Sequence, residues 1–111
     1  MARVFVPQKP SRFDKASNLW VPTVDLSAAE KYGVLNVMLP PEANRLHTVP
    51  LLAALREKMS EYSREDYFVA MGDPTIIAAA ACLAAIKTGG LLRMLKWDRQ
   101  SSDYIAVEFQ I

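Results

Sequence analysis

The sequence predicts one α/β domain, in which a mostly parallel sheet of four to five strands carries two main helices and ends in a C-terminal antiparallel hairpin. In the second half, continuous apolar strands alternate with helical segments in the order 34–39, 51–62, 67–71, 75–88 and 91–97. A short polar turn precedes a last apolar strand, which should therefore run antiparallel to its neighbour. The length of 111 residues fits a single core.

Composition excludes several classes of protein. The 13 Lys and Arg residues nearly balance the 12 Asp and Glu residues, so the net charge is +1. This balance argues against binding of nucleic acid or anionic lipid mainly by bulk electrostatics. A single Cys excludes an internal disulfide framework, and a single Cys with a single His supplies too few ligands for a zinc site. We expect no metal and no cofactor.

No targeting segment is expected. The apolar run within residues 1–7 is too short for a secretory signal, and basic residues follow it closely. The longest apolar run, residues 76–86, is about half a membrane span, which indicates a buried helix. Cys82 lies within this run, and we expect it to be a small core residue. A cytoplasmic location is the prediction.

The first third is predicted to be an irregular or extended basic arm over residues 1–24, followed by an α/β body over 25–111. Residues 3–6 alternate like a short strand, but three prolines then interrupt regular structure. An edge strand over 19–24 would make the arm a hairpin. Residues 1–20 carry a local charge of +3, and the rest of the chain totals −2.

Two polar segments of the body have simple structural interpretations. Ser27 and Glu30 have the spacing of a capping box, and Gly33 is placed as a helix stop, so one or two helical turns are predicted. Four carboxylates alternate with basic residues along and beyond the helix at 51–62, which indicates a solvated face; they are Glu57, Glu61, Glu65 and Asp66.

The turn Gly72-Asp73-Pro74 is the strongest local feature. Asp73 is a good N-cap, and Pro74 suits the first helical position. Ligands of open parallel sheets bind outside the carboxyl ends of strands, where helix N-termini point. Two other strand ends, at 40–41 and 97–99, could share one crevice with this turn. The candidate ligand-binding residues are Gly72, Asp73, Thr75, Trp97, Asp98, Arg99 and His47.

Several of these residues also have a plainer explanation. The Asp73 carboxylate would occupy the same backbone amides that a phosphate needs, and Trp97 could cover an edge of the core. His47 lies in a proline-rich loop where exposure is the simple expectation. No nucleophile is paired with a base and an orienting group, so no catalytic residue is predicted.

Basic and aromatic residues are interleaved in the arm, a combination that can grip a single nucleic-acid strand. A charge of +3 makes few phosphate contacts, so nucleic acid is possible but not favoured, and the arm could equally contact another subunit or protein. The candidate residues are Arg3, Lys9, Arg12, Phe13, Lys15 and Trp20.

Residues 67–109 resemble small α/β proteins encoded by tailed bacteriophages. The resemblance rests on GDP before an alanine-rich helix, on LKWDR at 95–99, and on YIAVE at 104–108, with a weaker likeness in RVFVPQ at 3–8. It implies a phage origin and the cytoplasm of an infected bacterial host. The glycine turn after a strand is also loosely similar to Rossmann-like ligand-sensor domains, a likeness of fold that does not fix function.

The first functional hypothesis is a non-catalytic phage accessory protein that acts by protein–protein binding or self-assembly, as a homo-oligomer or on a host or phage protein. The alternative is a small-molecule binder that holds a nucleotide or a nucleotide-derived signal at residues 72–75. A weak single-strand nucleic-acid binder is third, and an enzyme is not favoured. No membrane association is expected.

Overall fold

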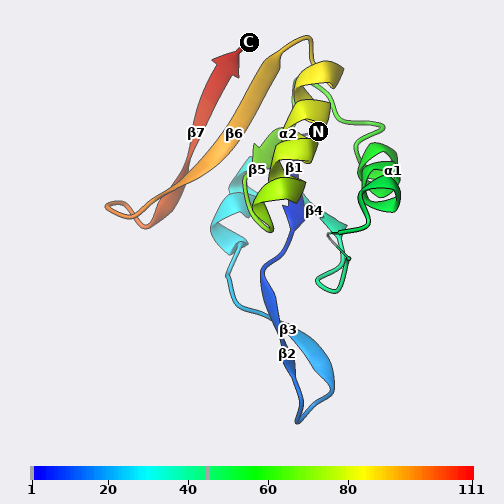
Figure 1. Cartoon of the computed structure of the whole chain (residues 1–111). Coiled ribbons are helices and arrows are strands. Elements are labelled where there is room, and N and C mark those ends of the chain that lie inside the picture. Colours follow the sequence, from blue (N-terminus) through cyan, green and yellow to red (C-terminus); the bar gives the residue numbers. More distant parts are fainter. Residues whose placement is uncertain (1, 45) are drawn as a thin grey trace.

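The computed structural model describes residues 2–44 and 46–111, which form a five-stranded sheet and a separate two-stranded hairpin (Figure 1). The helical elements are η1 (Ser27–Tyr32, a 3₁₀ helix), α1 (Thr48–Lys58) and α2 (Pro74–Lys87). The strands are β1 (Arg3–Gln8), β2 (Ser11–Asp14), β3 (Leu19–Pro22), β4 (Val34–Leu39), β5 (Tyr67–Val69), β6 (Leu91–Asp98) and β7 (Asp103–Gln110). The predicted mixed α/β fold is confirmed.

The main sheet has the strand order β4-β1-β5-β6-β7. The first four of these strands are parallel, and β7 runs antiparallel to β6, so the predicted C-terminal hairpin is also confirmed. From β1 the chain moves to β4 on one side, and then crosses back over β1 to β5 on the other side. The direction of winding therefore reverses between β1 and β5.

The two faces of the sheet are covered by different elements. Helices α1 and α2 cover one face, called here the helix face, where Phe5, Phe68, Leu55 and Ile76 are buried (Figure 1). The 3₁₀ helix η1 covers part of the opposite face, over Val4 and its neighbours. Connections on opposite faces are what right-handed crossovers require when the winding reverses.

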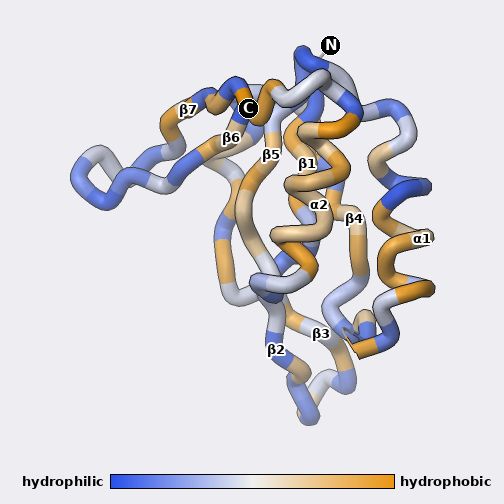
Figure 2. Tube along the Cα trace, turned by 45° about the horizontal axis from the view of Figure 1, so that its top comes forward, coloured by the Kyte–Doolittle hydropathy of each residue, from blue (hydrophilic) through white to orange (hydrophobic). Residues whose placement is uncertain are grey.

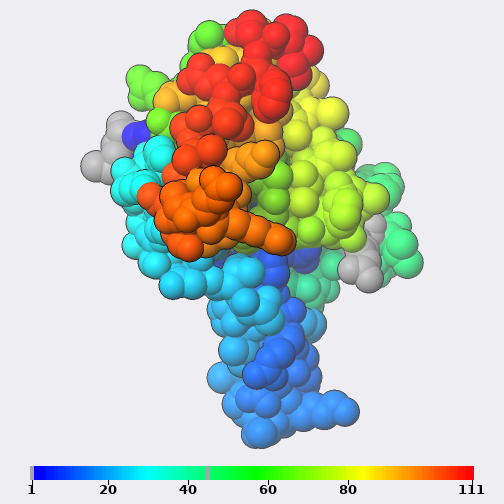
Figure 3. Space-filling view, turned by 90° about the vertical axis from the view of Figure 1, so that its left-hand side faces the viewer, coloured from blue at the N-terminus to red at the C-terminus, as the bar shows by residue number. Residues whose placement is uncertain are grey.

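The first strand belongs to the main sheet, so its predicted place in an arm over residues 1–24 is wrong. β1 pairs with β4 on one side and with β5 on the other, and Val4, Phe5 and Val6 are fully buried. Only the part that follows leaves the body. The hairpin of β2 and β3, called here the hairpin arm, projects from the sheet like a stalk (Figure 3).

The buried side of helix α2 could not be predicted from its sequence. The helix is apolar along most of its length (Figure 2), so its sequence carries no amphipathic pattern. The buried side consists of Ile76, Ala80 and Ala84, one turn apart from each other. Cys82 lies on the opposite side and is exposed, so its predicted core position is wrong.

Two further local predictions are corrected. The turn at η1 begins without the predicted capping box, because Leu26 is the N-cap and no side chain caps it. Instead the Asp25 carboxylate accepts a hydrogen bond from the Ser27 backbone N–H at 2.9 Å. This bond also lowers the pKa of Asp25.

Among the described residues, no helix is long and apolar enough to cross a membrane.

Asp66 is not part of a solvated face, because its side chain is only 2% exposed. Its carboxylate accepts hydrogen bonds from the backbone N–H of Arg3 and of Ser63, both at 2.9 Å. The Arg3 guanidinium forms an ion pair with it at 3.2 Å. The carboxylate therefore ties the start of β1 to the turn that leads into β5.

Candidate functional site

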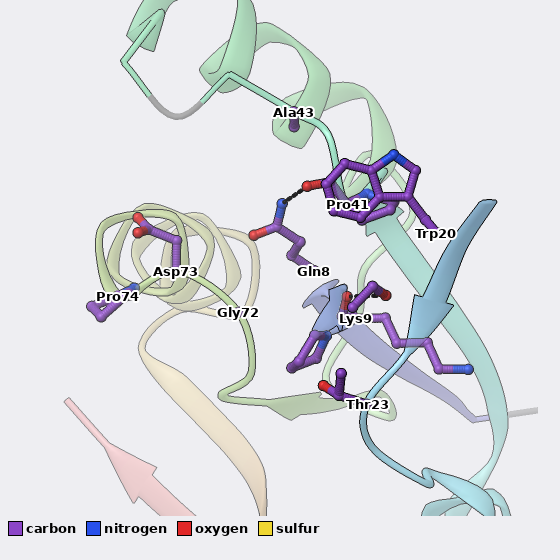
Figure 4. A pocket seen from close by; sticks show the side chains of 11 residues that line it. Gln8, Lys9, Trp20, Thr23, Pro41, Ala43, Gly72, Asp73 and Pro74 are labelled. Atoms are coloured by element: carbon purple, nitrogen blue, oxygen red, sulfur yellow. Dashed lines mark hydrogen bonds between the residues drawn. The ribbon is translucent and has the colours of Figure 1, made fainter. Parts of the chain in front are cut away.

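A pocket of about 500 Å³ opens at the carboxyl ends of β4, β1 and β5, beside the base of the hairpin arm (Figure 4). Its walls come from the segments that follow the three strands and from the arm. The lining residues are Gln8, Lys9, Pro10, Ser11, Trp20, Thr23, Pro41, Ala43, Gly72, Asp73 and Pro74.

The position of this pocket follows from the strand order. Open α/β sheets bind ligands outside the carboxyl ends of the strands, at the point where the winding direction reverses. Here that point lies between β1 and β5. Gln8 ends β1, and Gly72 follows β5, so the pocket lies at the topological switch point of the sheet.

Gln8 fixes the shape of the pocket floor. Its backbone N–H donates to the Met71 carbonyl at 3.3 Å, and its side-chain Nε2 donates to the carbonyl of Pro40 at 3.1 Å. Gly72 passes close above it: a Cβ at Gly72 would approach the Gln8 Cβ to 2.8 Å, and its φ is +121°. Glycine at position 72 is therefore required by close approach of the backbone and by its left-handed conformation.

Asp73 caps α2 as predicted. Its carboxylate accepts a hydrogen bond from the Thr75 backbone N–H at 3.1 Å and another from the Thr75 hydroxyl. Pro74 occupies the first helical position. The carboxylate thus occupies a donor that a bound phosphate would use, and its charge repels an anion there.

The hairpin arm supplies an aromatic wall. Phe13 and Trp20 face each other across β2 and β3, with ring centroids 5.6 Å apart in an edge-to-face arrangement. Trp20 lies beside Pro41 at the rim of the pocket, and the Lys9 side chain extends toward the outside (Figure 4). An indole ring, an ammonium group and a carboxylate therefore surround one opening, an arrangement suited to binding a small polar ligand.

The structure does not bring together all of the predicted ligand residues. Gly72 and Asp73 line the pocket, whereas Trp97, Asp98 and Arg99 belong to the β6–β7 hairpin and do not. Instead Trp97 contacts the Tyr104 ring edge-to-face, with centroids 5.1 Å apart. The end of β6 does not reach the pocket, because β6 continues past the end of β5 before it turns. The tip of the β6–β7 hairpin therefore lies away from the pocket (Figure 1).

The remaining ligand candidates also lie elsewhere. Asp98 orders the turn at the tip of this hairpin, where the Ser101 hydroxyl donates to it at 2.7 Å and lowers its pKa. His47 is the exposed N-cap position of α1, beside Asn44. Thr75 lines an apolar groove between α1 and α2.

The residues proposed for nucleic-acid or partner binding are divided as well. Arg3 bonds to Asp66 and is part of the fold. Lys9 and Trp20 line the pocket. Arg12, Phe13 and Lys15 lie on the exposed surface of the hairpin arm.

The strand end at 40–41 was expected at the crevice, and Pro41 does line the pocket, but sequence reasoning missed the contributions of Gln8, Thr23 and Ala43. The available signal was the short strand at 3–6, whose carboxyl end belonged among the strand ends considered. Because β1 was assigned to the arm, its end was not placed at the switch point.

A second surface stands out by its exposed apolar side chains. On β7, Ile105 is 44% exposed and Phe109 is 56% exposed, and Ile111 follows them at the chain end. β7 has a neighbour on one side only, so it is an edge strand. On the hairpin arm, Phe13 and Leu19 are also exposed.

Comparison with known proteins identifies a family. No curated protein and no solved structure matches the chain. The family described as Phage Pam3 gp32-like protein matches residues 2–111. The resemblance to phage proteins therefore extends from residues 67–109 to nearly the whole chain, while the Rossmann likeness stays a loose one of parallel strands covered by helices. The chain belongs to the Phage Pam3 gp32-like protein family.

Proposed function

We propose that this chain is a non-catalytic phage accessory protein that acts by protein–protein association, and self-assembly in the first place. The observation that supports the proposal is the clustering of exposed apolar side chains on two elements, β7 and the hairpin arm. They include Phe13, Leu19, Trp20, Ile105 and Phe109. The family match supports a host-cell context, and the proposal includes a location in the cytoplasm of an infected bacterium.

Both elements have the properties of association surfaces. An edge strand presents unpaired backbone groups to any strand that approaches it. A two-stranded hairpin alone is marginal in water, and the aromatic pair of Phe13 and Trp20 is half exposed, so contact with a partner would stabilise the arm. Clustered aromatic and aliphatic side chains are enriched in the centres of protein interfaces.

The oligomeric state tests this proposal. Light scattering after size-exclusion chromatography, together with sedimentation velocity over roughly 5 to 500 µM, should show a dimer or larger species whose population rises with concentration. A strict monomer over the whole range would refute self-assembly. Repeating the measurement with the Phe13→Ser and Leu19→Ser variant separates the contribution of the hairpin arm from that of the body.

A second candidate function, binding of a nucleotide or nucleotide-derived signal, is supported by the switch-point pocket. Trp20 offers a ring on which a base could stack, and Lys9 offers a cation for the phosphate at the outer rim, away from Asp73. A thermal-shift series with nucleotides at millimolar concentration tests this idea. A rise in melting temperature that Trp20→Ala abolishes supports it, and no rise with any nucleotide refutes it.

Single-strand nucleic-acid binding through the arm is the third candidate. Lys9, Arg12 and Lys15 are opposed there by Asp14, so few phosphates could be contacted. Affinity for an oligonucleotide that does not fall with rising salt would refute it.

A further inference from the structure

We infer that β7 pairs antiparallel with β7 of a second copy, about a two-fold axis at Val107, so that two sheets join into one ten-stranded sheet. The inference rests on the proposed self-assembly and names its surface and register. It follows from the backbone groups of the edge, from its charges and from its apolar side chains.

The direction of the β7 backbone groups is fixed by two hydrogen bonds. The Ile111 N–H donates inward to the Gly90 carbonyl at 2.8 Å. Because the direction alternates along an antiparallel strand, residues 105, 107 and 109 also point inward to β6, and residues 104, 106, 108 and 110 point outward. The Tyr104 carbonyl agrees, since it accepts a hydrogen bond at 2.9 Å from the hydroxyl of Tyr32, which belongs to η1 and not to the sheet. Ala106, Glu108 and Gln110 are therefore the residues whose backbone faces a new strand.

This edge has little of the usual protection against pairing. Residues 104–111 contain no proline, lysine or arginine, the residues that natural edge strands use as guards. The other edge, β4, also has no proline, lysine or arginine within the strand, but Pro40 and Pro41 follow it, and Lys58 and the hairpin arm border its carboxyl end. β7 has eight residues against six in β4, so β7 is the longer and less obstructed of the two edges.

Charge excludes one register. Glu108 is the one charged side chain of residues 104–111, and Arg93 of the same protomer pairs with it at 3.1 Å. An axis at residue 108 would place two Glu108 side chains directly opposite each other, which is destabilising. An axis at Val107 places each Glu108 opposite Ala106 of the second copy. The outward N–H and C=O groups of these two residues then form four hydrogen bonds across the axis.

The apolar side chains match in the same register. Ile105, Val107 and Phe109 share the helix face of the sheet, because Phe109 pairs with Leu92 and Val107 with Met94. Across the axis, Ile105 faces Phe109 and Val107 faces its own copy. The side chains that are half exposed in one chain thus form a continuous apolar strip between the two α2 helices. An axis at Ala106 would instead place Phe109 opposite the charged Asp103.

The first experiment removes the outward hydrogen bonds without disturbing the β6–β7 ladder. The Ala106→Pro variant lacks an N–H that points outward, and proline is tolerated on edge strands at such positions. Two bonds are lost per dimer, each worth about a factor of five, so the dissociation constant should rise about 25-fold. The matched control Ala106→Val keeps the N–H and should stay dimeric, and circular dichroism of both variants checks the fold.

The second experiment measures the register directly. Val107→Cys in a Cys82→Ser background should cross-link to itself under mild oxidation, because non-hydrogen-bonded partners lie about 4.5 Å apart between Cα atoms, within disulfide range. Phe109→Cys in the same background should not, since it faces Ile105. This test holds even if Ala106→Pro fails to fold.

The outcomes separate this inference from the proposed function. Loss of the dimer in Ala106→Pro together with cross-linking at position 107 supports the inference. An oligomer that survives Ala106→Pro and does not cross-link at 107 overturns it, while self-assembly through another surface stands. Cross-linking at 109 alone overturns the register. A wild-type chain that is monomeric at all concentrations overturns both.

Discussion

Replacing Asp66 by alanine removes a buried carboxylate that joins two ends of the fold. Its oxygens accept from the backbone N–H groups of Arg3 and Ser63, from the Ser63 hydroxyl at 3.3 Å, and from the Arg3 guanidinium. In the variant, the Arg3 N–H at the start of β1 loses the acceptor that now binds it. The expected result is a large loss of stability.

The magnitude can be worked out from these contacts. A hydrogen bond to a charged group contributes about 1.5 to 3 kcal/mol, but the four bonds share one carboxylate and water can enter at the partly exposed Arg3 side chain. Breaking a buried ion pair by removing one partner costs about 3 to 5 kcal/mol, and we expect the loss in this range. A domain of this size has roughly 5 to 15 kcal/mol of stability, so the variant would be close to unfolding.

Urea denaturation followed by far-ultraviolet circular dichroism measures this loss. With a slope of about 1.5 kcal/mol per molar urea, the midpoint should fall by about 2 to 3 M. Glu65→Ala is the matched control, because Glu65 is the adjacent carboxylate and is exposed, and it should change stability by about 0.5 kcal/mol or less. A loss under about 1 kcal/mol in Asp66→Ala would refute the reasoning that the buried carboxylate holds β1 in place.

Three further predictions concern other parts of the molecule. Burial and the nearby Asp66 charge raise the pKa of Tyr62 to about 12. Because an unfolded tyrosine loses its proton near pH 10, the folded state keeps its full stability below pH 10 and loses the contribution of Tyr62 as the pH rises toward 12. Tyr62→Phe should abolish this alkaline loss in denaturation curves and should not lower stability at pH 7, since no described residue hydrogen-bonds to the hydroxyl; a loss above about 1 kcal/mol at pH 7 would contradict this. Gly72→Ala should lower the melting temperature by several degrees, about 1 to 3 kcal/mol, because its Cβ collides with Gln8 and its φ is positive, and an unchanged melting temperature would contradict the close approach. Phe13→Ala should leave the melting temperature of the body nearly unchanged while trypsin cleaves the hairpin arm faster, and equal cleavage rates would show that the aromatic pair does not order the arm.

The order of the elements could be predicted because local chemistry marks their ends. Asp73 and Pro74 begin α2, and glycines at 89 and 90 follow it. These signals therefore also mark where the strand before the helix ends and where the strand after it begins. Such signals act within a few residues, and they survive in the fold because no tertiary contact opposes them. The same reasoning failed for Cys82, since a helix that is apolar on all sides gives no period from which to choose the buried side.

The site was predicted only in part, because it depends on contacts between distant segments. Gly72 and Asp73 were found from their own turn. Trp20 was noticed as part of a basic arm, but its place beside Pro41 follows from how the hairpin leaves β1, which no local pattern encodes. Asp66 shows the same limit: Glu65 and Asp66 are adjacent acidic residues, and only the approach of Arg3 makes one of them buried.

The location of β1 has a consequence for the order in which this protein can fold. β1 precedes every other strand of the sheet in the sequence, yet its two neighbours begin at residues 34 and 67. The apolar residues of β1 therefore stay exposed until both neighbouring strands have been synthesised and have paired with it. Parallel pairing over such sequence distances requires closure of long loops and slows folding. A nascent or truncated chain that ends before β5 would expose this strand, and such chains should depend on chaperones far more than the finished protein does.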